Sequence, residues 1–437
     1  MPFDFIAGAA YYLFGCFPRE GFPAAASVGV PKQQSVSIPF DTMPDHAAKL
    51  SFWGVRGSTP SMDRATWRYG GNTPCLELVT PDGGRFILDC GTGFRMLGNS
   101  GAYAGKDGQG SEPEIEADIF VTHYHWDHIQ GIPFFAPLYS PHNKFRFYSF
   151  RSEFVGDDSL KRVFETQMAR PYFPVNFGDM SAGREFTQIT GGDQFALRDT
   201  RITVRALNHP QGCLGFRFET PAGVIVYATD NEPGVREFDA ALVKLAEGAD
   251  IFINDAQYTP EQLETRKGWG HSSWLAGVGT AKAAGVRHLV LFHHDPDSSD
   301  KDLDNILRDA RRQFENVWMA AEGMVMTLGE RGMEIALRAE QSRLSEEANS
   351  RICVSGWTRE GSPFEEQTII GEVRLQGATL NLKHRPKLQS TLRVVIDNPA
   401  AQGRKQQVLQ ACVVRVDPYG GDEPTKEPAS VDIEFID

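Results

Sequence analysis

The sequence predicts a layered α/β sandwich followed by a small C-terminal all-β barrel. Short apolar runs bounded by glycine-rich turns recur between residues 48 and 292, and helical segments separate the later runs. Residues 338–350 are charged and lack a core pattern, which is typical of a linker. Beyond them, residues 351–437 alternate apolar and polar side chains without helical periodicity. We therefore expect an N-terminal extension and linker at 1–47, an α/β domain at 48–337, a linker at 338–350 and a barrel at 351–437.

Composition argues against several classes of protein. The chain has 437 residues and a formal net charge of −13, which argues against an extended surface that follows nucleic-acid phosphates. A large nucleic acid is therefore not expected as a partner. The six cysteines form no CxxC pair, so a disulfide framework is not expected and a reducing cytoplasm fits. No apolar run is long enough to span a membrane, and residues 3–17 carry Asp4 and lack the basic start of a signal peptide.

The elements of the α/β domain follow from apolar runs and their flanking turns. Residues 3–14, ahead of it, are either a short helix or a partly ordered tail. The stretch 98–117 is polar and glycine-rich, which indicates a loop, and 141–195 is expected to be irregular apart from a helix near 158–168. Strands are expected at 75–79, 85–89, 119–121, 201–206, 215–219, 224–228, 250–254 and 287–292, and later helices at 238–246, 273–284 and 300–314.

One stretch concentrates ligand-type side chains. His123, His125, Asp127 and His128 lie within six residues, directly after the apolar run 119–121 and before Gly131. Alternation at the end of a strand directs the first two histidines to the same side, and the following turn brings Asp127 and His128 towards the same space. Imidazole and carboxylate groups that converge on one point suit a divalent transition metal such as zinc. A histidine-rich surface loop is the alternative interpretation.

Similar side chains follow other predicted strands. His209 comes after the strand at 201–206, Asp230 after the strand at 224–228, and His293 and His294 after the strand at 287–292. His271 lies at the expected start of a helix. Because sites in layered α/β folds form at strand ends, we expect these side chains to supply further ligands. Any one of them alone is more often an ordinary polar loop residue.

This constellation resembles the metallo-β-lactamase fold superfamily over roughly residues 48–337. Within it, the chain is most similar to the phosphodiesterase branch of phosphoribosyl cyclic phosphodiesterases and tRNA 3′-processing endonucleases. Besides the HxHxDH motif at 123–128, the resemblance rests on the stretches 53–60, 69–75, 88–93, 255–258, 269–274 and 291–296. It implies an αββα sandwich and a catalytic domain with a dinuclear metal site.

The resemblance also implies a ligand set. One metal would be held by His123, His125 and His209, the second by Asp127, His128 and His293, with Asp230 bridging the two. His294 is the alternative to His293, and Asp89 resembles a buried aspartate that orients ligands. His271 matches the histidine that contacts phosphate and protonates the leaving oxygen, and Asp127 joins it in the expected catalytic pair. The two divalent ions are expected to be zinc, with manganese or iron as alternatives.

The expected chemistry is hydrolysis of a phosphodiester. A hydroxide bridging two metals is a strong nucleophile near neutral pH, and the metals offset the charge that builds on the phosphorus. His271 would supply the proton opposite the nucleophile. Arg56 and Asn72, in two glycine-rich loops, are expected to bind the substrate; alternatively, Arg56 pairs with an acid elsewhere and the glycines only permit tight turns.

The expected substrate is a small, cyclic phosphodiester, such as a cyclic nucleotide or a phosphoribosyl cyclic phosphate. The aromatic and mixed-charge stretch 141–195 differs from a basic tRNA-binding arm. One alternative is an RNA 3′ endonuclease of the tRNase Z type. The other is a non-catalytic module for cyclic-dinucleotide signalling, which has no need of seven metal ligands.

The C-terminal 85 residues or so resemble a PilZ domain, a class that often binds cyclic di-GMP. The resemblance rests on 372–380, 392–396 and 431–435. No RxxxR pair precedes the barrel, and 372–377 reads EVRLQG where such domains carry DxSxxG. A degenerate module that packs on the catalytic domain or mediates a homodimer is therefore expected.

Overall fold

The structure is a computed structural model. It describes residues 47–101, 103, 114–329, 332–337, 351–358, 361–374, 377–383, 386, 390–397, 406–416 and 429–435. The helix expected within residues 3–14 and the linker expected at 338–350 lie outside these ranges.

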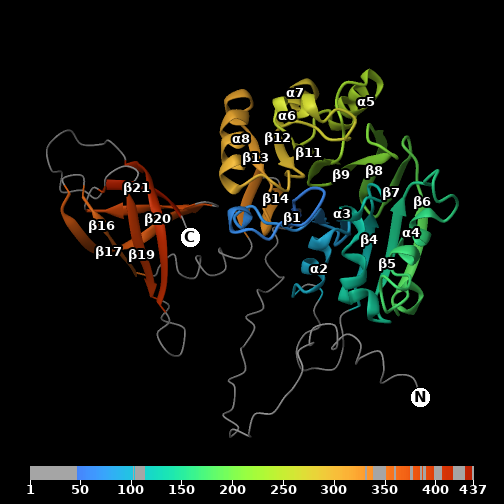
Figure 1. The fold of residues 1–437 in the computed structure, drawn as a ribbon, viewed down its shortest axis with the longest axis horizontal. Helices are drawn as coiled ribbons and strands as arrows, with labels where there is room; N and C mark the ends of the chain where they lie inside the picture. Colours follow the sequence, from blue (N-terminus) through green and yellow to red (C-terminus); the bar gives the residue numbers. More distant parts are fainter. Residues whose placement is uncertain are drawn as a thin grey trace, which may run out of the picture. The chain divides into compact units, whose positions relative to one another are not determined.

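Two mixed sheets form the main domain (Figure 1). The larger sheet has the order β15 (Gly332–Leu337), β14 (Met324–Gly329), β1 (Ala48–Gly54), β2 (Cys75–Val79), β3 (Arg85–Leu88), β4 (Glu116–Phe120), β5 (Lys144–Ser149), β6 (Gly183–Gln188). The second sheet has the order β13 (Val317–Met319), β12 (His288–Phe292), β11 (Ile251–Asp255), β10 (Gly223–Ala228), β9 (Cys213–Thr220), β8 (Thr200–Leu207), β7 (Gln194–Leu197). Strands β3 to β6 run parallel to one another, and so do β10 to β13.

Helices cover the outer faces of both sheets. On the first sheet lie α2 (Thr92–Gly98) and α4 (Ser159–Gln167), and on the second lie α5 (Arg236–Ala246), α7 (Trp274–Ala284) and α8 (Asp300–Gln313). Shorter elements connect these: α3 (Trp126–Ile129), α6 (Pro260–Thr265), η1 (Arg64–Thr66), η2 (Ile132–Phe134), η3 (Ala136–Tyr139) and η4 (Phe177–Asp179). The result is the expected αββα sandwich.

Local sequence explains where the helices begin and end. The Ser299 side chain accepts a hydrogen bond from the Asp302 amide, and the Asp302 carboxylate accepts one from the Ser299 amide, which forms a capping box at the start of α8. The buried side chains of α8, spaced three and four residues apart, form one apolar stripe against the sheet: Leu303, Ile306, Leu307 and Ala310. Helix α7 ends at Gly285, whose φ of 63° is left-handed.

The inner faces of the two sheets share one core. Phe120 of β4 packs edge-on against Phe216 of β9 at a ring distance of 5.2 Å, and Phe86 of β3 contacts Phe218 at 5.6 Å. A second apolar cluster lies between the first sheet and its helices, where Phe147 of β5 contacts Phe164 of α4. Strand β11 is buried along its whole length, as expected for a central parallel strand.

One stretch departs from the prediction. Residues 141–195 were expected to be irregular, yet they contain β5, β6 and the start of β7 besides the predicted helix α4. In β5, Phe145 and Phe147 point to the buried side and alternate with Lys144 and Arg146, so the aromatic residues carry a strand pattern. Strand β6 lies at the sheet edge and is mostly exposed, which leaves no apolar signal in its sequence.

The C-terminal strands close into a barrel. Its order is β16 (Arg351–Trp357), β17 (Pro363–Arg374), β18 (Gly377–Leu382), β21 (Ala429–Phe435), β20 (Gln406–Val416), β19 (Thr391–Asp397), closing on β16. Inward side chains such as Ile352, Val354 and Leu392 are fully buried. The likeness to a PilZ domain and the homodimer remain predictions.

Candidate metal centre

The parallel strands bring the predicted ligands to one edge. The loop after β4 carries His123 and His125 and leads into α3, which holds Asp127 and His128. Strands β8, β10 and β12 end just before His209, Asp230 and His293, respectively. Because carboxyl ends of parallel strands meet at the same edge of a sheet, side chains distant in sequence converge there.

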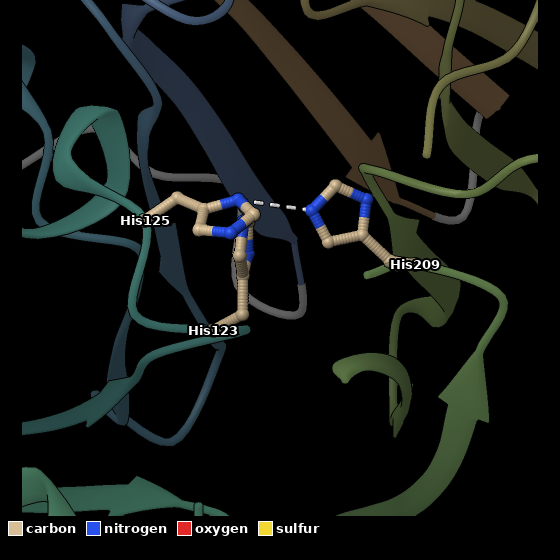
Figure 2. Close-up of side chains that lie close together, drawn as sticks. All are labelled: His123, His125 and His209. Atoms are coloured by element: carbon tan, nitrogen blue, oxygen red, sulfur yellow. Dashed lines mark hydrogen bonds between the residues drawn. The ribbon is translucent and has the colours of Figure 1, made fainter. Parts of the chain in front are cut away.

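Three histidines form a first group, here called the three-histidine cluster: His123, His125 and His209. Figure 2 shows their rings turned towards one another, with His125 Nδ1 and His209 Nε2 3.0 Å apart. The ring centroids of His123 lie 4.5 Å from His125 and 4.6 Å from His209. Their ligand atoms lie within 4.8 Å of one another, close enough to share one ion.

A second group, the mixed cluster, combines two carboxylates with two imidazoles: Asp127, His128, Asp230 and His293. The Nε2 atoms of His128 and His293 lie 3.2 Å apart. Asp127 Oδ2 lies 3.2 Å from the former and 3.1 Å from the latter. All four side chains are nearly or fully buried.

Asp230 joins the two clusters through its two oxygens. Its Oδ1 lies 3.4 Å from His128 Nε2 and 3.3 Å from His293 Nε2. Its Oδ2 faces the other way, 3.6 Å from His123 Nε2 and 3.9 Å from His209 Nε2. One carboxylate therefore presents one oxygen to each cluster, which is the geometry of a bridging ligand.

The protonation states of the three-histidine cluster suit cation binding. Burial lowers the pKa of His209 to about 4, and burial also lowers the pKa values of His123 and His125, so all three imidazoles are neutral. Burial opposes ionisation of Asp230, but the facing His293 and His128 outweigh it and hold its pKa well below the usual range. Burial would lower the pKa of His128, but Asp127 and Asp230 outweigh burial and raise this pKa well above its ordinary value. Since neutral imidazoles and ionised carboxylates are the forms that bind metals, a metal in the mixed cluster would displace a proton from His128.

One buried ring nitrogen of the three-histidine cluster is available to bind an ion. His123 Nε2 is buried and has no hydrogen-bond partner among the described residues. In the mixed cluster, ligand atoms from two imidazoles and two carboxylates converge, and a divalent cation would take the place of the proton on His128. The donor set of imidazole and carboxylate, without a thiolate, suits zinc, manganese or iron.

Neighbouring groups fix the orientation of the imidazole rings. His128 Nδ1 lies 2.9 Å from Asp89 Oδ2, and Asp89 is itself held by hydroxyls of Thr122 and Tyr227. His209 Nδ1 donates to the Gly270 carbonyl at 2.8 Å. Such partners on the distal nitrogen turn the other nitrogen towards the ion.

Gln257 fixes the orientation of the His293 ring. Its Oε1 lies 3.0 Å from His293 Nδ1, while its amide nitrogen donates to the Ser58 hydroxyl at 3.2 Å. The backbone N–H of Ser58 in turn donates to Asp127 Oδ2 at 2.8 Å. Gln257 and Ser58 thus connect two members of the mixed cluster, and no pattern in the sequence predicted a role for either.

His271 lies beside both clusters and has a partner that the sequence analysis also missed. Its Nδ1 is 2.9 Å from Asp255 Oδ2 and 3.8 Å from Asp230 Oδ2. Burial alone would lower its pKa, but the carboxylate of Asp255 outweighs burial and raises the pKa to about 9. Asp255 ends β11, so its position at a strand end was the available signal.

The structure does not support substrate contact by Arg56. This side chain is fully buried, and its guanidinium donates to the carbonyls of Gly70, Asp295 and Ser298 at 2.9–3.2 Å. Among the described residues it forms no ion pair with an acid, so the alternative interpretation is not supported there. Its four hydrogen bonds instead join two loops, because buried carbonyls need partners where no strand supplies them.

Asn72 and His294 are also committed to internal contacts. Asn72 donates through its backbone and its side-chain amide to the carboxylate of Glu322, at 2.5 and 2.8 Å, which leaves no sign of an open substrate contact. His294 is fully buried and its Nε2 donates to the Ala320 carbonyl at 2.8 Å. It belongs to neither cluster, so of the two neighbouring histidines it is His293 that the structure brings to the site.

Three of the central residues adopt left-handed backbone conformations. Asp89, Asp230 and His293 have φ values of 62°, 48° and 60°. Such conformations cost roughly 1–3 kcal/mol each in residues other than glycine and gather at functional sites. Here they turn side chains at three strand ends towards one point.

Comparison with known proteins finds similarity over the part of the chain that carries the site. Residues 84–294 match the Beta-lactamase superfamily domain. Ribonuclease Z from Methanosarcina acetivorans is 25% identical over 326 residues, which cover 64% of this chain and 98% of that protein.

Two solved structures are also similar. The short form of human tRNase Z has a TM-score of 0.46 at 20% identity and covers 63% of this chain and 98% of its own. A diphosphatase from the PhnP family has a TM-score of 0.46 at 18% identity and covers 64% of this chain and 97% of its own. Among the described residues, no helix is both long and apolar enough to cross a membrane. Over residues 84–294, which include every member of the two clusters, the chain is thus similar to the Beta-lactamase superfamily domain.

Proposed function

We propose that this protein is a dinuclear metal-dependent phosphodiesterase that cleaves RNA. The observation that carries the proposal is the pair of clusters joined by Asp230, with the His271–Asp255 pair beside them. The similarity to ribonuclease Z favours RNA over the small cyclic diester expected from the sequence. Because of that similarity, a large nucleic acid is no longer excluded as a substrate.

We assign one ion to the three-histidine cluster and the other to the mixed cluster, with Asp230 as the shared ligand. Zinc is the proposed metal, because it is bound readily by neutral imidazole and carboxylate. When bound, the two ions would supply the Lewis acidity that activates water and offsets the charge of the phosphodiester.

The residues of the chain then divide the remaining tasks. Asp127 and Asp230 hold negative charge inside the site and would fix the ions relative to each other. His271 is the proposed proton donor to the leaving oxygen, since Asp255 holds Nδ1 and leaves Nε2 for the substrate. Asp255 is a positioning residue that keeps His271 protonated and oriented.

A second candidate is hydrolysis of a small cyclic phosphodiester. Two observations favour it: the net charge of −13, and the folding of residues 144–149 and 183–188 into strands of the main sheet. A basic arm for gripping a large RNA would have to come from elsewhere in the chain.

Turnover measurements distinguish these candidates. The protein reconstituted with zinc is expected to hydrolyse an aryl phosphodiester and to cleave a tRNA precursor at its 3′ side. His125→Ala is expected to lose both activities. Turnover of cyclic mononucleotides without RNA cleavage would favour the second candidate, and a fully metal-loaded protein that cleaves no diester would refute both.

A further inference from the structure

Two tryptophans stand exposed on the backbone that forms the site. Trp126 lies between His125 of the three-histidine cluster and Asp127 of the mixed cluster, and its side chain is 79% exposed. Trp269 lies two residues before His271 and is 61% exposed. Large aromatic side chains normally bury most of their surface, so two exposed indoles beside one site require an explanation.

The backbone on both sides of Trp269 is held in place. The carboxylate of Glu232 accepts hydrogen bonds from the amides of Gly268 and Gly270, at 2.8–2.9 Å. Glu232 is tied to the end of β8 through its own amide, which donates to the Asn208 carbonyl at 2.8 Å. The Gly270 carbonyl accepts a hydrogen bond from His209 Nδ1. The indole therefore projects from a loop that is fixed against the three-histidine cluster.

The backbone at Trp126 is held in place as well. It begins α3, where its carbonyl accepts from the Gln130 amide at 2.9 Å and the His125 carbonyl accepts from the His128 amide at 3.0 Å. Its neighbours on both sides are residues of the site, so its backbone cannot shift without moving them. Its indole has no ring contact with another described aromatic residue, whereas most aromatic residues of the domain pack in pairs.

From this placement we infer that Trp126 and Trp269 form a stacking platform for the bases next to the scissile phosphodiester. The inference rests on the proposed function and specifies its substrate as a base-bearing nucleotide or RNA strand. Stacking on aromatic rings is tolerant of base identity and needs no positive charge. In a chain with a net charge of −13, stacking supplies binding energy that phosphate contacts would otherwise have to supply.

The test uses the dinucleoside monophosphate ApA, which has a single diester, and an analogue with hydrogen in place of each adenine. The full-length zinc-loaded protein is expected to prefer ApA in kcat/KM by about 5-fold to 100-fold, the range for one stacked base. Trp126→Ala and Trp269→Ala should each reduce this preference, and the corresponding phenylalanine variants should retain most of it.

Matched controls separate stacking from damage to the site. Trp67 is 68% exposed, and the adjoining Arg68 and Tyr69 pair with Asp304 of α8. Trp67→Ala is expected to leave the preference unchanged. The metal content of every variant is measured, so that a loss of ligand geometry is recognised.

The outcomes are distinct. Equal kcat/KM for ApA and its analogue in the wild type, or a preference that survives in the Trp126→Ala/Trp269→Ala double variant, would overturn the platform. Neither result would contradict the proposed function if an aryl phosphodiester is still hydrolysed. Failure to hydrolyse any diester with both metals bound would instead refute the proposed function. Loss of binding to a protein partner, with the ApA preference intact, would show that the indoles serve a protein surface.

Discussion

At the scale of single residues, Asp230 couples the two halves of the site. Its Oδ1 faces His128 and His293, and its Oδ2 faces His123. Removing its carboxylate therefore takes one ligand from each cluster, whereas removing a histidine takes a ligand from only one. The two kinds of change should differ in how many ions the protein retains.

We predict that Asp230→Ala weakens metal affinity at both clusters, by about 100-fold or more. His125→Ala should weaken it mainly at the three-histidine cluster. Metal-to-protein ratios after dialysis measure the difference, with Asp309→Ala on α8 as the control. Equal loss in Asp230→Ala and His125→Ala would contradict a bridging role for Asp230.

His271 and Asp255 are the second residue-level unit. Asp255 accepts from the backbone amides of Gln257 and Ser272, at 2.9 and 3.1 Å, as well as facing His271. Its position is therefore fixed before any substrate arrives. This makes it a stable anchor for the orientation of the imidazole.

We predict that Asp255→Asn lowers kcat by about 10-fold to 100-fold with a smaller change in KM, because His271 loses its charge partner. The loss should be greater for RNA, whose leaving group is an alkoxide, than for an aryl ester, whose phenolate leaves without a proton. Steady-state kinetics on both substrates provide the comparison. An equal loss on both would indicate that Asp255 supports the fold or the metals rather than the proton donor.

At the scale of elements, short turns after the strands determine whether the ligands meet. Gly270 has a φ of 87°, and a Cβ atom there would lie 2.2 Å from His209 Nδ1. Gly268, two residues earlier, has a φ of 86°, but a Cβ atom there would meet no heavy atom within 4 Å. The two glycines share a backbone conformation and differ in the space beside them.

Alanine substitutions at these two positions form a matched pair. Both are expected to lower the free energy of unfolding by about 1 kcal/mol, because alanine disfavours a left-handed backbone. Only Gly270→Ala should also displace His209, with loss of metal from the three-histidine cluster and of turnover. Thermal denaturation and metal analysis of both variants test this. Normal metal content in Gly270→Ala would show that His209 is not a ligand in its present position.

At the scale of the whole molecule, all the candidate ligands among the described residues belong to the main domain. Both apolar clusters of the sandwich, with the side chains packed against them, draw on residues 48–335, and neither includes a barrel residue that the structure describes. All members of the three-histidine and mixed clusters lie between residues 123 and 293. The barrel has its own buried residues, such as Val354 and Val394.

We therefore predict that a chain ending at residue 337 still folds, binds metal and hydrolyses an aryl phosphodiester at a rate within about twofold of the full chain, since both apolar clusters and all the candidate ligands lie within residues 48–337. Size-exclusion chromatography of the two proteins tests whether the barrel mediates a dimer. Loss of metal or of solubility in the shortened chain would show that the barrel supports the site.

The sequence by itself determined the sandwich, most strand positions and the candidate ligands, because apolar periodicity and strand-end histidines are local signals. The αββα architecture is confirmed, and the predicted ligands converge as a set: His123, His125, Asp127, His128, His209, Asp230 and His293. The edge strand β6 was missed because exposed strands lack an apolar pattern. Arg56 was misassigned because glycine-rich loops resemble phosphate-binding loops whether or not their arginine faces solvent.

Only the tertiary structure decided which residues surround the ligands. The supporting contacts join residues far apart in sequence, and they are made by Asp255, Gln257, Glu232 and Ser58. It also distinguished His293 from its neighbour, because a φ of 60° turns His293 into the mixed cluster while His294 bonds to the Ala320 carbonyl. Backbone turns and long-range hydrogen bonds depend on the packing of the whole domain, so no local pattern encodes them.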